Sequence, residues 1–359
     1  MTADLFSRPI DLFIFQSGVV IIGFYTTFSS RGDDQRSNLS NDLCQAGLIV
    51  LFFLTYAGVG PDSISYGQYF DQYLVYPITE SIFFIKQVLF LGFGGLLTLF
   101  LHPPWPLKIL SMIGVGFFLF GMFRFVRTVN SPAISLSLTF CLLTPGVVYL
   151  FANGVRQGMA CALAFVGFYY LIHRRWLRAV SLTAVAIGVH ISAGVAFITS
   201  GIFGFIPSRY LWLVLMLSPL CGFGVYVFFG IDGPGGVHLN YNDNTEGSFH
   251  LSRLAFSYIL AVIALRCSTQ MEQFQQSWLM RAYAGSVGIA GFFLMWEAPS
   301  SRLLLQSDLF LPGVAALILA NYRDLWIDSN LLKILLVLGT ILGGWMFLAL
   351  PSTQITLFY

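Results

Sequence analysis

Long apolar runs dominate this sequence and limit the folds that are open to it. Each run is near the roughly 20 residues of a membrane-spanning helix, or somewhat shorter. Of the 359 residues, 57% are hydrophobic and 9% are charged, whereas soluble domains carry roughly 25% charged residues. The short alternating strands of a membrane barrel are absent. The runs lie at residues 12–28, 46–59, 82–101, 106–123, 132–151, 157–172, 177–205, 210–229, 254–266, 279–296, 304–320 and 333–350.

The sequence therefore predicts an all-α protein. In bilayer hydrocarbon every backbone N–H and C=O group needs an internal partner, which a helix provides. We expect a polytopic transmembrane helix bundle with about 11–13 membrane segments, including re-entrant or short helices. Residues 1–359 are predicted to form a single integral membrane domain, because no internal repeat and no low-complexity linker divides them.

Missing motifs argue against several classes of protein. The sequence has no P-loop, GxGxxG fingerprint, HExxH motif or DxD pair. His238 and His250 share a stretch with two aspartates, but their spacing does not resemble a zinc site. The five cysteines are scattered without a CxxC motif and are predicted to be small buried hydrophobes. We expect no cofactor, no metal and no nucleic-acid partner.

The distribution of positive charge predicts the orientation of the chain. Basic residues cluster in the stretches 31–36, 124–127 and 173–178, which the positive-inside rule assigns to the cytoplasm. Residues 230–252 carry acidic side chains but no Lys or Arg. They are predicted to form a long outer loop, periplasmic or extracellular.

Counting the runs shows that one of them does not cross the membrane. Five runs separate the first basic stretch from the third, and an odd number cannot join two cytoplasmic loops. The run 82–101 contains Lys86 and a glycine-rich break, so we expect it to be re-entrant, within an outer loop over residues 60–104. The run 177–205 is expected to go out and return, with a turn near His190.

This topology gathers polar groups at the outer face, and two of them are arginines. Arg156 stands between two apolar runs, where an ionisable residue suggests a function. Its guanidinium suits phosphate oxygens, and a helix start would add backbone donors and a positive dipole end. Arg302, just before the run 304–320, repeats this pattern, and two arginines facing one cavity could clamp a pyrophosphate. The alternative for both is an interfacial anchor that reaches lipid headgroups.

Other polar residues on this face are candidates for chemistry or sugar binding. His190 could relay a proton or donate a hydrogen bond, or it could cap a helix hairpin. Asp62 could act as a base toward a sugar hydroxyl, or cap a short helix. Glu80 and Tyr66 could bind sugars, although tyrosines also form the ordinary interfacial belt.

Three motifs follow one another in the middle of the chain. They are Asn153-Gly-Val-Arg156-Gln157-Gly-Met-Ala160, the basic turn 173–178 and Gly188-Val-His190-Ile-Ser192-Ala193. In this order they resemble the centre of the EpsG family of membrane polysaccharide polymerases, which is related to the Wzy-type O-antigen and exopolysaccharide polymerases.

The flanking regions resemble the same family less specifically. Upstream, Gly60-Pro-Asp62-Ser-Ile-Ser-Tyr66 is similar to the family's G-x-D-x-x-x-Y, with Pro61 where threonine is frequent. Downstream, Arg302, Asp308 and, more weakly, Arg253 match its arginine-bearing last third.

The resemblance implies a glycosyltransferase-C-like enzyme that needs no metal and no nucleotide sugar. The growing polymer on undecaprenyl diphosphate would be the donor and a lipid-linked repeat unit the acceptor. The product would be a surface polysaccharide, made on the outer face of the bacterial cytoplasmic (inner) membrane. Arg156 and Arg302 would hold the leaving diphosphate, and His190 or Asp62 would orient or deprotonate the attacking hydroxyl. Substrate-binding residues would be Tyr66, Asn153, Gln157, Arg253, Asp308 and Glu80.

Membrane lipid and a chain-length regulator or flippase are the partners that such an enzyme implies. Two alternatives remain open at this point. A transferase that uses polyprenyl-monophosphate sugars would depend more on an outer carboxylate such as Asp62 or Glu80. A transporter or flippase of lipid-linked sugars would be expected to show paired repeats, which the sequence lacks.

Overall fold

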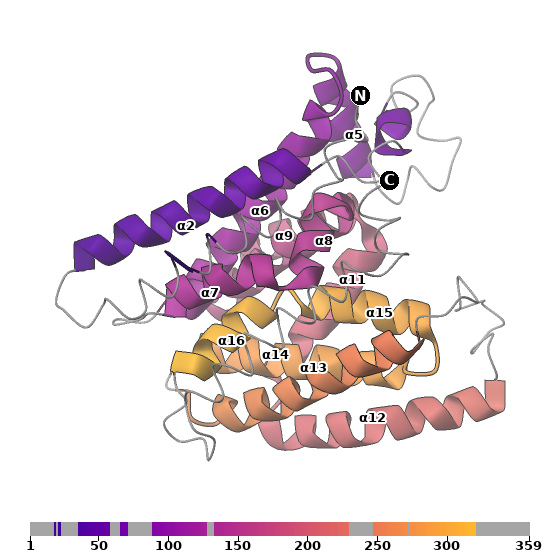
Figure 1. The fold of residues 1–359 in the computed structure, drawn as a ribbon. Helices are drawn as coiled ribbons and strands as arrows, with labels where there is room; N and C mark the ends of the chain where they lie inside the picture. The colour runs from indigo at the N-terminus through magenta and orange to yellow at the C-terminus, as the bar shows by residue number, and fades with distance from the viewer. Residues whose placement is uncertain are drawn as a thin grey trace.

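The computed structural model describes residues 18, 21–22, 35–57, 65–70, 88–127, 133–229, 247–271 and 273–320. This part of the chain is 88% helical and contains no strand, which confirms the all-α prediction. A short helical stretch covers residues 65–70. The longer helices, labelled in Figure 1, are α2 (Gln35–Tyr56), α5 (Val88–Thr98), α6 (Trp105–Val126), α7 (Ala133–Leu143), α8 (Pro145–Ala152), α9 (Val155–Ile172), α10 (Trp176–Val189), α11 (Ile191–Ile202), α12 (Ser208–Phe229), α13 (Gly247–Ser268), α14 (Phe274–Phe292), α15 (Glu297–Ser307) and α16 (Leu311–Ala320), with a 3₁₀ turn η2 at Phe203–Phe205.

Three of the described helices are long and apolar enough to cross a bilayer: α6, α9 and α12. The pairs α7–α8 and α15–α16 add up to two more if each bent pair crosses as one span. Helices α5, α10 and α11 are apolar but shorter. The protein is thus a polytopic helical membrane protein, as the sequence predicts.

Two of the predicted apolar runs are broken helices. The run 132–151 divides at Thr144 into α7 and α8, which are bent by 71°. Thr144 is extended because Pro145 follows it, and a residue before proline avoids the helical conformation. The run 304–320 divides into α15 and α16, which are bent by 50°. The prediction of one helix over 304–320 with Arg302 just before it is wrong, because Arg302 lies inside α15.

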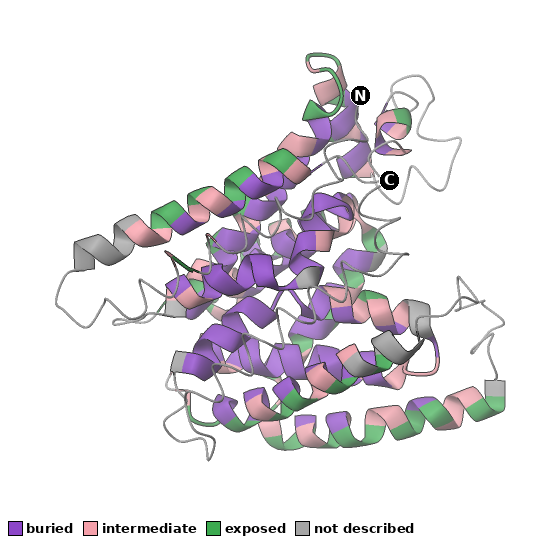
Figure 2. Ribbon diagram, viewed as in Figure 1, coloured by how far each residue is buried: buried purple, intermediate pink, exposed green. Residues whose placement is uncertain are grey.

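Helix α9 forms the centre of the bundle. All of its residues from Gly158 to Phe168 are buried, and it packs against α6 and α10. Helix α14 is buried along most of its length and packs against α12 and α13. Helices α2 and α12 lie along opposite edges in Figure 1, and Figure 2 shows that both carry many exposed residues while buried residues fill the helices between them.

Helices α9 and α10 form an antiparallel hairpin through the basic turn. The 18 residues of α9 extend over about 27 Å, close to the thickness of bilayer hydrocarbon. The chain reverses at residues 173–175, where Arg174 has a φ of 58°. Helix α10 then packs back along α9. The hairpin therefore returns the chain from the basic turn toward the end of α9 that carries Arg156.

The predicted turn near His190 is present. Helix α10 ends at Val189 and α11 begins at Ile191. A Cβ added at Gly194 would lie 3.2 Å from the Ala186 carbonyl oxygen, whereas a straight helix would separate these residues by about 12 Å. The chain therefore bends sharply at His190.

The other segments for which the sequence suggests an unusual topology are described only in part. Within the predicted outer loop 60–104, the structure describes the 65–70 helix, α5 and the turn that leads to α6. Within the predicted loop 230–252, α13 begins at Gly247, and the residues before it lie outside the described part of the chain.

Candidate functional site

Arg156 is the second residue of α9, so the predicted helix start is present. No side chain caps this end of the helix. Helix α8 approaches closely here, because a Cβ at residue 158 would overlap the carbonyl oxygen of Leu150. Gly158 thus allows α9 to start against α8. Arg156 is partly exposed at this start, where backbone N–H groups and the helix dipole favour an anion.

Tyr66 holds the Arg156 side chain from a distant part of the sequence. The Nε group of Arg156 donates a hydrogen bond to the Tyr66 hydroxyl oxygen at 3.0 Å. The Arg156 Cζ atom also lies 4.8 Å from the centre of the Tyr66 ring, within range of a cation–π contact. The ring itself is buried, with Phe90 of α5 at 5.4 Å and Phe70 at 6.5 Å between centroids. Tyr66 therefore orients the guanidinium at the start of α9.

His190 caps the start of α11. Its Nδ1 atom accepts a hydrogen bond from the backbone N–H of Ala193 at 3.3 Å. An imidazole that accepts at Nδ1 is neutral and carries its proton on Nε2. The predicted capping role is thus present, and it fixes which ring nitrogen is a donor.

Arg302 and Arg156 both lie near His190. Helix α11, which His190 caps, packs against both α9 and α15, so the positive charges of Arg156 and Arg302 act on the imidazole. Arg302 is exposed and lies in the middle of α15. Unlike Arg156, it therefore does not lie at a helix start, where backbone N–H groups could help to bind an anion. The structure therefore brings together three of the predicted catalytic residues, at the end of α9 opposite the basic turn.

Asp308 links the two broken helices. Its carboxylate accepts a hydrogen bond from Arg253 of α13 at 2.6 Å and another from the backbone N–H of Gly146 at 3.1 Å. Asp308 is buried and Arg253 is partly buried. Gly146 is in the first turn of α8, and a Cβ there would overlap the Asp308 carboxylate. We call Arg253, Asp308 and Gly146 the junction.

The junction joins the start of α8 to the end of α15, whereas Arg302 lies in the middle of α15 and Arg156 follows the end of α8; we call Arg156 and Arg302 the arginine cluster. Helices α8 and α15 pack together, with Gly146 against Asp308. From these contacts, seven residues lead along α8 to Asn153 and six lead back along α15 to Arg302. The first path covers about 10.5 Å of helix and the second about 9 Å. The junction thus sets the position of α15, and with it Arg302, relative to α8.

Two of the remaining predicted site residues lie near Arg156 in the sequence, and two lie outside the described residues. Asn153 ends α8 and is buried, and its Oδ1 atom has no hydrogen-bond partner among the described residues. Gln157 follows Arg156 in the first turn of α9 and is partly exposed. Asp62 and Glu80 lie outside the described residues. In the described part of the chain, no group of three or more His, Cys, Asp or Glu side chains could hold a metal ion.

Sequence reasoning missed two residues that build this region. Gly146 was hidden inside an apolar run, although the Pro145-Gly146 pair is a turn signal that could have revealed it. Phe90 packs against Tyr66, and no local pattern distinguishes it from other phenylalanines of the apolar runs.

The fold and the residues gathered at the start of α9 define a class: a polytopic helical membrane protein with a cluster of basic side chains at one end of a central span. The profile of the EpsG family matches residues 43–353, and the chain belongs to that family of Wzy-like polysaccharide polymerases. It is accordingly a membrane polysaccharide polymerase in the general sense of the family. No curated protein and no solved structure gives a significant match to the chain.

Proposed function

We propose that this polymerase joins oligosaccharide repeat units carried on undecaprenyl diphosphate. A hydroxyl oxygen of the acceptor unit attacks the anomeric carbon of the donor sugar. The bond between that carbon and the diphosphate oxygen breaks, and undecaprenyl diphosphate leaves with the bonding electrons. The hydroxyl proton passes to a base. The observation that carries the proposal is the packing of α11 against α9 and α15, which brings Arg156, His190 and Arg302 to one end of a spanning helix.

In this mechanism Arg156 and Arg302 stabilise the charge that develops on the leaving diphosphate. Arginine donors suit phosphate oxygens, and donors fixed in advance need no reorganisation during the reaction. Arg156 is fixed by Tyr66, and the helix start supplies further donors. Asn153 and Gln157 flank Arg156 and supply amide groups for sugar hydroxyls. The donor sugar already carries a diphosphate leaving group, so the proposed reaction requires no nucleotide sugar. The arginines supply the positive charge, so it requires no metal.

His190 and Asp62 take different roles in this mechanism. The Ala193 N–H occupies Nδ1 of His190, so the neutral ring offers Nε2–H as a donor to a substrate oxygen. This favours His190 as an orienting donor, and Asp62, four residues before Tyr66 in the sequence, as the base that takes the hydroxyl proton.

The orientation of the bundle supports synthesis on the outer face of the cytoplasmic membrane. Arg156 and the basic turn lie at opposite ends of α9, about 27 Å apart. If the basic turn is cytoplasmic by the positive-inside rule, Arg156 faces the periplasm or exterior. A lipid-linked unit delivered to that face would meet the arginines directly.

The function is tested with purified protein in detergent. We expect wild-type protein to convert an undecaprenyl-diphosphate-linked repeat unit into a ladder of longer products on a gel, with EDTA present and no nucleotide sugar added. Detergent removes the membrane barrier, so a transporter would give no ladder. Intact substrate without a ladder would contradict the proposal and favour a polyprenyl-monophosphate-sugar transferase or a transporter.

A pair of substitutions separates the two roles of His190. Asparagine is a good helix N-cap, so His190→Asn should keep the stability of the protein, whereas His190→Ala should lose about 1 kcal/mol. Both should lower the rate of polymerisation by about 100-fold, because both remove the Nε2–H donor. Thermal unfolding and initial rates measure the two effects. A wild-type rate in His190→Asn would show that the histidine only caps the helix.

A further inference from the structure

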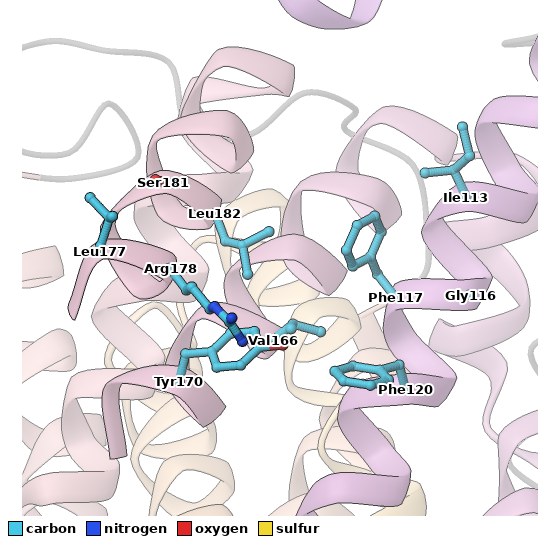
Figure 3. Close-up of a pocket in the computed structure, with 10 residues that line it drawn as sticks. All are labelled: Ile113, Gly116, Phe117, Phe120, Val166, Tyr170, Leu177, Arg178, Ser181 and Leu182. Atoms are coloured by element: carbon cyan, nitrogen blue, oxygen red, sulfur yellow. The ribbon is translucent and has the colours of Figure 1, made fainter. Parts of the chain in front are cut away.

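An open apolar groove lies on the outside of the bundle, away from the arginine cluster. Its volume is about 720 Å³, within the range of roughly 300–1,000 Å³ that is usual for ligand sites. Helices α6, α9 and α10 form its walls (Figure 3). The lining residues are Ile113, Gly116, Phe117, Phe120, Val166, Tyr170, Leu177, Arg178, Ser181 and Leu182.

The groove is located in the half of the bundle next to the basic turn. Its α9 residues, Val166 and Tyr170, belong to the last two turns of that helix, and its α10 residues to the first two turns. Next to it, Trp176 and Val180 are 62% and 63% exposed, although both are apolar. Because α10 packs against the spanning helix α9, its exposed apolar residues face lipid, so the groove opens toward the bilayer.

Positive charge is concentrated at the groove. The Arg178 guanidinium extends over the Tyr170 ring, with its Cζ atom 5.5 Å from the ring centre (Figure 3). From the other wall, the Cζ atom of Arg124 lies 5.1 Å from the centre of the Phe120 ring. Arg174 and Arg175 are exposed in the adjoining turn. One arginine thus lines the groove, and three more lie in the parts of α6 and the basic turn next to it.

No acidic residue balances these arginines in the sequence around them. Between Glu80 and Asp232 the chain contains nine Lys and Arg residues and no Asp or Glu. All three helices that line the groove lie within this stretch. An anion bound at the groove would therefore meet no acidic side chain from the helices that line it.

We propose that the groove binds an acyl chain of an anionic phospholipid, whose phosphate contacts Arg178 and Arg124. Apolar walls suit the acyl chain, and the arginines suit the headgroup. On the proposed function, the polyprenyl carrier presents its diphosphate to Arg156, at the far end of α9. A phosphate bound at Arg178 therefore belongs to a lipid of the opposite leaflet, and this site is separate from the site of polymerisation.

Native mass spectrometry of the purified full chain tests this proposal without an activity readout. The probes are phosphatidylglycerol, phosphatidylethanolamine and undecaprenyl phosphate, each added at several concentrations to detergent-solubilised protein. We expect phosphatidylglycerol to be retained most strongly. Arg178→Gln should weaken its binding about fivefold, as the loss of one basic residue near a membrane surface predicts, and should bring it closer to phosphatidylethanolamine.

Gly116→Leu tests the apolar part of the site. A Cβ at residue 116 meets nothing within 4 Å, so the leucine extends into the groove without a clash, and leucine favours a helix more than glycine does. This variant should lose binding of phosphatidylglycerol and phosphatidylethanolamine together. Arg209→Gln is the matched control, because Arg209 is exposed, lies 4.7 Å from the Tyr210 ring and is remote from the groove.

The binding of phosphatidylglycerol to the wild type and the variants decides whether the groove is a lipid site. Weaker phosphatidylglycerol binding in Arg178→Gln and Gly116→Leu, with wild-type binding in Arg209→Gln, supports the lipid site. Equal phosphatidylglycerol binding in wild type and both groove variants overturns it. A preference of the wild type for undecaprenyl phosphate that these variants abolish also overturns it, since the groove would then hold the polyprenyl chain. Polymerisation measured in parallel reports on the proposed function separately.

Discussion

Replacing Arg156 with alanine is expected to abolish polymer formation while the protein remains folded in the membrane. The variant removes a guanidinium that Tyr66 holds at the start of α9. Loss of one fixed donor to a developing negative charge costs about 100- to 1,000-fold in rate. The initial rate of ladder formation from an undecaprenyl-diphosphate-linked repeat unit measures the effect, and gel filtration of the purified variant checks its fold.

Two companion variants test how Arg156 acts. Arg156→Lys should not restore the rate, because an ammonium lacks the planar fork that binds two phosphate oxygens. Tyr66→Phe keeps the ring but removes the hydroxyl that accepts from Nε, so a smaller loss is expected. Arg209→Ala, which removes an exposed arginine far from the cluster, is the control and should be fully active. Full activity in Arg156→Lys would contradict the bidentate interpretation.

Local features of the candidate site could be predicted from the sequence. Arg156 stands between two apolar runs and is followed by Gly158, so its position at a helix start is readable from neighbouring residues. The break at His190 is likewise a local interruption of an apolar stretch. In contrast, 90 residues separate Tyr66 from Arg156, and 162 separate Gly146 from Asp308. A single sequence does not encode such pairs as a pattern, because they depend on the packing of whole helices.

The broken helices show why hydropathy alone was insufficient. An average over about 20 residues recognises an apolar stretch but does not register the direction of its axis. The signals that matter are single prolines: Pro145 begins α8, and Pro312 lies in the first turn of α16. Because proline is tolerated in the first turn of a helix, these two residues mark the starts of the second half-helices.

Disrupting the junction is expected to have the second large effect. Asp308→Ala leaves Arg253 without its carboxylate partner, and breaking a buried ion pair by removing one member costs about 3–5 kcal/mol. The same change frees the backbone N–H of Gly146. Both stability and polymerisation should fall, because α15 carries Arg302 and loses the hydrogen bond that joins it to α8. Thermal unfolding in detergent and the initial rate of polymerisation measure these losses.

Gly146→Ala separates this positioning role of Asp308 from direct substrate binding. The added methyl group would overlap the Asp308 carboxylate, so it disturbs the junction without changing any candidate substrate-binding side chain. We expect the same pattern of losses as in Asp308→Ala, whereas Gly224→Ala, in open space, should polymerise normally. If Gly146→Ala were as active and stable as wild type while Asp308→Ala were folded but inactive, the carboxylate itself would be needed at the substrate. The two half-helices would then not depend on this contact for their arrangement, and the substrate-binding role that the family resemblance implies for Asp308 would be favoured.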